Sequence, residues 1–381
     1  MAIRNFRNLM LVTAALALTA CGGGGGGGGG GNNPPPPPPP ADPLGPVGSV
    51  ADEQDRLFMS IGDNFVVPRY AAMMTAMGGL ETAATDYCAN PAAGDLSTFQ
   101  DAWRDAMTAW QAITIIRFGP VEENNRRLRI QFFPDENDAV LNNVTQVLNN
   151  GLAIDETLIA GSAVGAQGLP AMEYLLFDLG GLDDAVDGPR RCELAVAVAQ
   201  NLSTMADELA TAWDPAGQLL ADFTSASGTF TDRADVLTEI LESMALETEF
   251  VADEKITRPI AVGSQATESF RSEFSRENLI ANTDALRTLL DIGTAATDYG
   301  LTDYLRRAHS ADPISTQLND QLQAAQDGLD VLTASIEAII LGTETGDIDI
   351  VRTSMQDLAD SFIDAAVAAD VNLGFSNQDG D

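Results

Sequence analysis

Apolar residues recur at helical spacing through nearly the whole chain from residue 50 onward. In the clearest segment, Phe99, Trp103, Ala106, Trp110 and Ile113 follow one another at intervals of three or four residues. This is the apolar stripe of a helix that faces a core. Alternating β-branched runs bounded by hairpin turns are scarce. The sequence therefore predicts an all-α protein. Similar spacing predicts further helices over residues 140–148, 194–213, 234–250, 279–290, 318–341 and 351–367.

Three stretches interrupt this periodicity and are rich in Gly, Pro and Arg. They cover residues 117–138, 161–192 and 251–276. Connectors of this length in a compact domain are usually functional or disordered. We therefore expect the functional residues to lie in or beside these connectors.

One hexapeptide occurs twice, as Thr82–Tyr87 and again as Thr294–Tyr299, each time after an apolar helical segment. A repeat of this kind suggests duplication. We expect two helical bundles packed against each other, the first over residues 50–190 and the second over residues 191–381.

The N-terminus has the pattern of an export signal. Arg4 and Arg7 precede an apolar stretch, Leu9–Leu18, which is too short to span a bilayer but has the length of a secretory signal core. The stretch runs into Leu-Thr-Ala-Cys, which is typical of a bacterial lipoprotein cleavage site. We expect residues 1–20 to be a signal peptide and Cys21 to carry the lipid. The protein would then face the periplasm from a membrane of the cell envelope, and Gly22 favours the outer membrane.

A low-complexity segment follows the expected lipid. Residues 22–31 are all glycine and residues 34–40 are all proline. A flexible glycine tract joined to a stiffer polyproline segment has the physical character of a tether. We expect residues 21–49 to link the membrane to the folded part.

Two cysteines remain once Cys21 is acylated. In an oxidising compartment, Cys88 and Cys192 are expected to pair more often than to stay free. The alternative is two small buried thiols.

The charge and the scarcity of His and Lys exclude several functions. The chain has 20 basic and 56 acidic residues and a formal net charge of −36, so binding to a nucleic-acid backbone is excluded. His309 is the single histidine and Lys255 the single lysine. One chain therefore cannot form a two-His zinc site, and a Ser–His or Cys–His nucleophile would depend on His309 alone. We expect His309 to be a solvated side chain at a helix end.

Several motifs, in order along the chain, resemble those of imelysin-like proteins. They are Trp103–Trp110 leading into Arg117-Phe118-Gly119-Pro120, Arg129-Ile130, Phe133-Pro134-Asp135, Gly168–Phe177, Arg258-Pro259, Glu268–Ser272 and the ending Gly374–Asp381. The resemblance implies an all-helical fold of two four-helix-bundle-like domains, export to the envelope and a link to iron-regulated systems. It also implies the metallopeptidase activity for which the family was first labelled.

The family signature is Gly-x-His-x-x-Glu, whose His and Glu could share a metal. The corresponding residues here run from Gly168 to Glu173, and Pro170 stands where the histidine would be. Proline suits the first turn of a helix but cannot bind a metal. The sequence resembles the lipoprotein branch with Gly-Leu-Pro-Ala-x-Glu, and we assign no catalytic residue.

Glu173 is a charged residue among apolar neighbours, and burying it without a partner would be costly. Four arginines in or beside the connectors are the expected partners: Arg117, Arg129, Arg258 and Arg271. One interpretation is a ligand pocket at the domain junction. The other is a buried ion pair that fixes how loops dock on the bundle.

The candidate pocket also includes Ser272 and Trp110, although the spacing of Trp110 favours core packing over a ligand contact. We predict a binding protein for iron or another metal, and the oxygen ligands of Glu173 would suit ferric iron or calcium. Its expected partners are the membrane, through the lipid, and an envelope protein of an iron-uptake system. The alternatives are a metal-dependent peptidase and a non-catalytic partner-docking module.

Overall fold

The described chain is helical, and none of its described residues lies in a β-strand. The computed structural model describes residues 43–91, 95–178, 182, 188–291 and 298–373. The all-α prediction is confirmed. The α-helices are α1 (Val50–Ile61), α2 (Val67–Ala89), α3 (Leu96–Gln111), α4 (Arg126–Ile130), α5 (Ala139–Asn149), α6 (Glu156–Ala160), α7 (Leu169–Phe177), α8 (Gly188–Ala212), α9 (Gln218–Ser225), α10 (Arg233–Phe250), α11 (Arg258–Val262), α12 (Ser275–Asp291), α13 (Leu301–His309), α14 (Asp312–Asp330), α15 (Ile336–Leu341) and α16 (Asp349–Ala368).

Several predicted features lie outside the described residues. They are the signal peptide, Cys21, the Gly/Pro tracts, most of the second copy of the hexapeptide and the ending Gly374–Asp381.

Local sequence explains where the principal helices begin. Ser49 caps α1 and forms a reciprocal capping box with Asp52. Asp95 caps α3 and Asp232 caps α10 through side-chain oxygens that accept from backbone N–H groups. Within α3, the predicted stripe is buried. The apolar spacing in the sequence thus correctly identified the core-facing side of this helix.

Two long helical runs each contain a π-helical segment. Gly62–Val66 joins α1 to α2, and Val251–Thr257 joins α10 to α11. The expected connector from residue 251 is therefore helical as far as Val262, and the irregular segment begins only at Gly263. A second difference is that the helix predicted over 318–341 is broken between Asp330 and Ile336. π-helical segments often occur at functional sites, and the second one here carries the buried Lys255.

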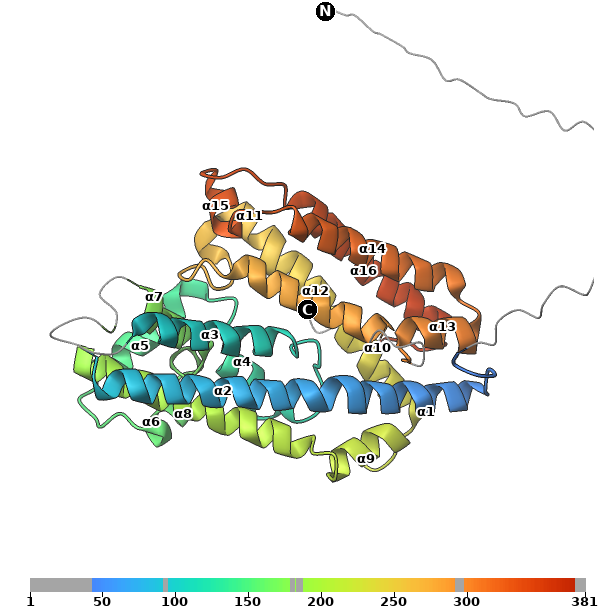
Figure 1. Cartoon of the computed structure of the whole chain (residues 1–381), viewed down its shortest axis with the longest axis horizontal. Coiled ribbons are helices and arrows are strands. Elements are labelled where there is room, and N and C mark those ends of the chain that lie inside the picture. The colour runs from blue at the N-terminus through green and yellow to red at the C-terminus, as the bar shows by residue number, and fades with distance from the viewer. Residues whose placement is uncertain (1–42, 92–94, 179–181, 183–187, 292–297, 374–381) are drawn as a thin grey trace, which may run out of the picture. The chain divides into compact units, whose positions relative to one another are not determined.

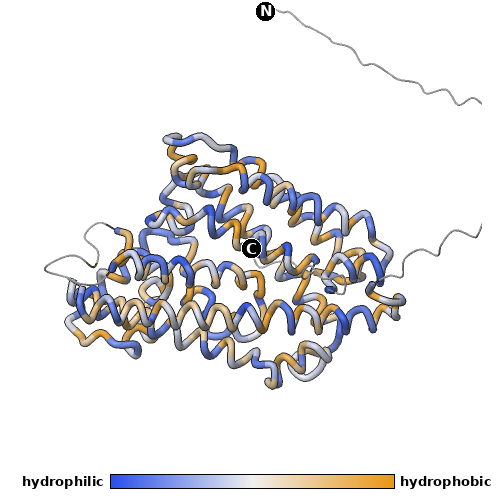
Figure 2. Tube along the Cα trace, viewed as in Figure 1, coloured by the Kyte–Doolittle hydropathy of each residue, from blue (hydrophilic) through white to orange (hydrophobic). Residues whose placement is uncertain are grey.

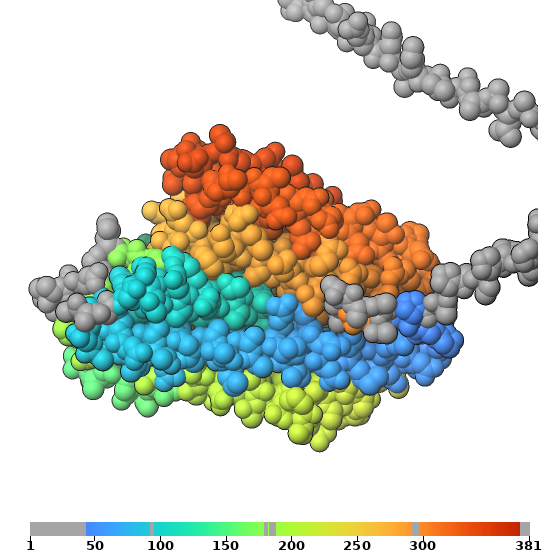
Figure 3. Space-filling model, viewed as in Figure 1, coloured from blue at the N-terminus to red at the C-terminus, as the bar shows by residue number. Residues whose placement is uncertain are grey.

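The helices form one continuous stack (Figure 1). α2 packs along α8 and α3, α3 contacts α7 and α12, and α12 contacts α14, which in turn packs along α16. Figure 3 shows the same order on one face, with the surface of α2 between that of α8 and that of α3. Because α8 packs on α2, the contacts cross the expected boundary at residue 190. That boundary stays a prediction, and the duplication is not confirmed.

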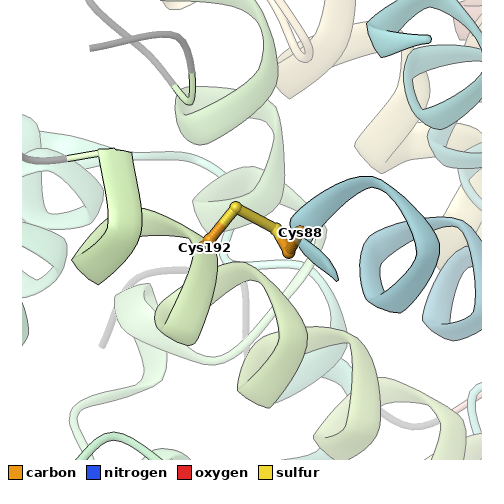
Figure 4. The surroundings of a disulfide bond; sticks show 2 residues. All are labelled: Cys88 and Cys192. Atoms are coloured by element: carbon orange, nitrogen blue, oxygen red, sulfur yellow. A yellow bond between two sulfur atoms is a disulfide. The ribbon is translucent and has the colours of Figure 1, made fainter. Parts of the chain in front are cut away.

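The predicted disulfide is present (Figure 4). Cys88, near the end of α2, is bonded to Cys192, near the start of α8, across a separation of 104 residues. In the chain-entropy model, closing a loop of this length stabilises the folded state by about 4 to 5 kcal/mol.

No helix in the described ranges is long and apolar enough to cross a membrane. Apolar and polar residues are interspersed along the helices (Figure 2), as expected for elements that each bury one face.

Candidate functional site

The start of α7 is held tightly against the rest of the protein. A Cβ atom on Gly168 would lie 2.3 Å from the carbonyl oxygen of Ile130, so only glycine permits this approach. The indole Nε1 of Trp103 donates to the carbonyl of Leu169 at 3.0 Å. Pro170 occupies the first turn. The Gly and Pro of the motif therefore place Glu173 at a fixed point inside the protein.

Glu173 is only 3% exposed. Its Oε1 accepts hydrogen bonds from the backbone N–H of Ser272 at 2.9 Å and from the Ser272 hydroxyl at 2.7 Å. No hydrogen bond to Oε2 is formed by any residue in the described part of the chain. Burial raises the pKa of Glu173 to about 7, against the opposing effects of Ser272 and Arg271. The carboxyl group can therefore gain or lose a proton near neutral pH.

Glu173 lines a cavity of about 60 Å³, which we call the carboxylate cavity. Its size is sufficient for several water-sized groups. Four acidic and two basic residues contribute to its wall, so the charge of the wall favours a cation. The lining residues are Met107, Gln131, Phe132, Phe133, Asp135, Asp138, Val140, Pro170, Glu173, Arg258 and residues 265–271.

One wall of this cavity is the loop between α11 and α12. Two of its residues, Ser269 and Glu273, have left-handed backbone conformations with φ of 60° and 53°, which cost energy for residues other than glycine and recur at functional sites. Thr267 at one end donates to Glu337 Oε1 at 2.8 Å, and Ser272 at the other donates to Glu173. Buried carboxylates on α7 and α15 thus fix this loop.

A second cavity of about 90 Å³, the basic cavity, adjoins the first. Gln131, Phe133 and Glu268 line both. Three basic and two acidic side chains line it, and half of its other lining residues are aromatic. The residues are Trp110, Thr114, Arg117, Arg127, Leu128, Gln131, Phe133, Glu247, Phe250, Lys255 and Glu268.

A buried polar network surrounds Lys255, which is 3% exposed. Its Nζ lies 3.0 Å from Glu268 Oε1 and donates to Gln111 Oε1 at 2.7 Å and to Asn282 Oδ1 at 2.9 Å. Gln131 Nε2 donates to the same Glu268 oxygen at 2.8 Å. All three ammonium protons of Lys255 are therefore used. The hydrogen bonds to Gln111 and Asn282 join the π-helical segment to α3 and α12.

Glu247 is the second buried carboxylate of the basic cavity. Arg117 and Arg127 lie 3.3 Å and 3.1 Å from its Oε2, and the Thr114 hydroxyl donates to Oε1 at 2.7 Å. Burial acts to raise the pKa of Glu247, but the charges of Arg127, Lys255 and Arg117 outweigh it and hold the pKa below its ordinary value. Unlike Glu173, Glu247 has its counter-charges within the protein.

The expected arginine partners do not form an ion pair with Glu173 among the described residues. Arg271 pairs instead with Asp178 at 3.1 Å, although it lines the carboxylate cavity. Arg258 lines the same cavity and lies 3.8 Å from Glu136. The reason is geometric, because the loop that carries Arg271 presents the N–H and hydroxyl of Ser272 to Glu173.

The other predicted residues lie further away. Arg117 is in the basic cavity, and Arg129 donates to Gln167 Oε1 at 2.7 Å. Trp110 is buried in the core and donates to Gln131 Oε1 at 2.6 Å. His309 ends α13 and lies 2.9 Å from the Tyr304 hydroxyl.

Sequence reasoning missed Glu247, Lys255, Glu268 and Glu337 as site residues. One signal was available, because Glu247 continues the apolar stripe of Ile240 and Met244 on α10 and is therefore on the buried face. The other three are positioned by tertiary contacts that no local pattern reveals.

The residues present do not fit a preformed metal site of the family's His–Glu type. Pro170 supplies no ligand, and in the described ranges no three His, Cys, Asp or Glu side chains converge to hold a metal ion. A cation in the carboxylate cavity would have to bring most of its own ligands.

The fold and site define an all-α protein with a buried, ionisable carboxylate that lines a small cavity. The family model described as Imelysin matches residues 66–363. The chain belongs to the imelysin family.

Solved structures agree with this fold. An imelysin-like protein from Psychrobacter arcticum 273-4 is similar with a TM-score of 0.69 and 19% identity, over 86% of this chain and 99% of that one. A protein from Parabacteroides distasonis ATCC 8503, called an iron-regulated protein A precursor, is similar with a TM-score of 0.71 and 16% identity. The similarity covers 86% of this chain and 98% of that one. No curated protein matches the chain.

Proposed function

We propose that this protein is a lipid-anchored binding protein of the cell envelope that holds a metal cation, together with the cation's own water or chelator oxygens, in the carboxylate cavity. Glu173 supplies the negative charge. The observation that carries the proposal is a carboxylate that is 3% exposed and lines a cavity, with one oxygen unbonded in the described part of the chain. A bound cation would provide the missing counter-charge.

The chemistry of the wall supports a cation that remains partly complexed. Carboxylate, amide and hydroxyl oxygens are hard ligands, which suit iron in its ferric state or calcium. The iron-regulated name of one structural neighbour favours iron. Because the protein supplies few ligands, we expect binding without the bond cleavage that a peptidase requires.

The location of the protein belongs to the same proposal. The Leu-Thr-Ala-Cys sequence supports lipid on Cys21 and attachment to the outer membrane. From there the protein would pass its cargo to an envelope protein of an iron-uptake system. Mass spectrometry of the membrane fraction tests the lipid, and Cys21→Ala should release the protein from that fraction.

Calorimetric titration of the purified chain with Fe²⁺ under anaerobic conditions, with weakly chelated Fe³⁺ and with Ca²⁺ tests the binding. We expect one saturable site for an iron species, with affinity that rises as the pH is raised through about 7, because Glu173 must lose its proton to bind. Glu173→Gln should weaken binding at least tenfold.

Glu239→Gln is the matched control. Glu239 on α10 is also a carboxylate whose pKa burial raises, but it does not line either cavity. This variant should bind the cation as the wild type does. Equal binding by wild type and Glu173→Gln would overturn the proposal. Metal-dependent proteolysis lost in Glu173→Gln would instead establish the peptidase, and binding of an envelope protein without any cation would establish the docking module.

A further inference from the structure

Basic side chains are scarce in this chain, yet three of them meet at the basic cavity. Arg117, Arg127 and Lys255 line a space of about 90 Å³ in a protein with 20 basic and 56 acidic residues. Phe250 lies beneath two of them, 5.6 Å from the Arg117 guanidinium and 5.8 Å from Lys255 Nζ. This concentration of positive charge next to the carboxylate cavity calls for a physical explanation.

Three carboxylates balance this charge, those of Glu247, Glu268 and Glu122, the last 3.6 Å from Arg127 Nε. They do not use every guanidinium donor. Arg117 donates to Glu247 through Nη1 alone, and within the described ranges no acceptor lies at its Nε or Nη2. Arg127 donates through Nη2 to the same Glu247 oxygen and through Nη1 to the carbonyl of Thr114 at 2.5 Å. Two guanidinium groups thus share one carboxylate oxygen, and half of the Arg117 fork stays open.

We propose that the basic cavity binds a small oxyanion of the phosphate or bicarbonate class on the open donors of Arg117, beside Arg127. A planar guanidinium fork matches two oxygens of such an anion. Burial and the neighbouring Arg127 lower the pKa of Arg117, and an anion at this position would offset that repulsion. Lys255 holds the wall in place, because its donors are already used by Glu268, Gln111 and Asn282.

The oxyanion has two sources. It could enter free from solution, or it could arrive as a ligand of the cation in the carboxylate cavity, since Gln131 and Glu268 separate the two spaces and line both. The second source rests on the proposed function, and the first does not. Both sources use the same arginine site.

Calorimetric titration of the purified full chain with inorganic phosphate, at low ionic strength and with chloride as the reference anion, tests the site. We expect one saturable phosphate per chain. Arg117→Gln should weaken phosphate binding at least tenfold. Arg117→Lys keeps the charge but loses the guanidinium fork, so its phosphate affinity should lie between those of the wild type and Arg117→Gln. Repeating the titration with a cation below the solubility limit of its phosphate separates the two sources. Binding by phosphate alone indicates the free anion, and binding only with the cation indicates a metal ligand.

Arg104→Gln is the charge-matched control, because Arg104 lies on α3 with its side chain 35% exposed, paired with Asp101 and outside this cavity. It should change phosphate affinity less than twofold. Circular dichroism and thermal melting verify that each variant folds. Glu173→Gln should leave binding of free phosphate intact, which keeps this test separate from that of the cation. No saturable phosphate with or without the cation, or equal weakening by Arg104→Gln and Arg117→Gln, would overturn the inference.

Discussion

Glu173 and Glu247 show how the same residue type takes different roles in one site. Both are nearly fully buried. Glu247 contacts two guanidinium groups and has a lowered pKa. Among the described residues, Glu173 accepts hydrogen bonds from Ser272 alone, and its pKa is raised. A structural carboxylate is paired within the protein. The ionised form of a buried, unpaired carboxylate lowers the stability of the fold. Selection is expected to keep such a residue when its negative charge is needed to bind a ligand.

Glu173→Gln should therefore stabilise the cation-free protein at alkaline pH. The folded-state pKa is raised from 4.5 to about 7, so the wild type loses stability as the pH rises from about 4.5 through 7. By linkage the loss is up to about 3 kcal/mol. Glutamine keeps an acceptor for Ser272 and does not ionise. Urea unfolding gives the free energy of unfolding of both proteins at pH 5 and pH 8.5. The difference between the variant and the wild type should shift in favour of the variant by about 1 to 3 kcal/mol at the higher pH. A constant difference between the two pH values would mean that Glu173 does not titrate in this range.

At the scale of elements, the end of the expected tether is held by two helices. Arg307 of α13 donates to the carbonyls of Gly45 and Pro46 at 3.3 Å and 3.1 Å, and to Glu53 Oε2 of α1 at 3.1 Å. Tyr299 donates to the same Glu53 oxygen at 2.6 Å. Residues 43–49 were expected to belong to the tether. Gly45 and Pro46, whose carbonyls accept hydrogen bonds from Arg307, are instead bound to the folded part.

This contact predicts acid sensitivity. Burial acts to raise the pKa of Glu53, but hydrogen bonds from Arg307 and Tyr299 outweigh it and lower the pKa from 4.5 to about 2. Its stabilisation, up to about 3 kcal/mol, is present above about pH 5 and is lost as the pH falls toward 2. Glu53→Gln should be less stable than wild type at pH 7, with the difference narrowing below pH 4. Asp55→Asn, which breaks a more exposed pair with Arg233, should change stability by about 0.5 kcal/mol or less. Equal effects of the two substitutions would contradict this assignment.

The local sequence pattern predicted the helices and their buried faces better than it predicted the tertiary contacts between them. The α3 stripe, the Cys88–Cys192 pair and the burial of Glu173 follow from spacing, compartment and neighbouring residues. The partner of Glu173 does not, because Ser272 lies 99 residues away and reaches it through a loop with left-handed Ser269 and Glu273. The Lys255 network likewise joins residues as far apart as 171 positions, and no local periodicity in the sequence encodes such a contact.

At the scale of the whole molecule, the helices bring two small cavities of different charge side by side. The carboxylate cavity has four acidic and two basic residues in its wall, whereas the basic cavity has two acidic and three basic residues. The segment between α4 and α5 and the loop before α12 provide most of the wall of the carboxylate cavity, and α3, α4, α10 and the segments that follow them provide most of the wall of the basic cavity. The basic side chains of the basic cavity are largely buried.

The most direct measurement is the titration of the Glu173 carboxyl group by ¹³C NMR of the purified chain labelled at glutamate, with the signal assigned by its absence in Glu173→Gln. The carboxyl should titrate with a pKa of about 7 in the cation-free protein, and addition of the bound cation should shift that midpoint to lower pH. A midpoint near the ordinary value of 4.5, unchanged by any cation, would contradict the assignment of Glu173 as the binding carboxylate.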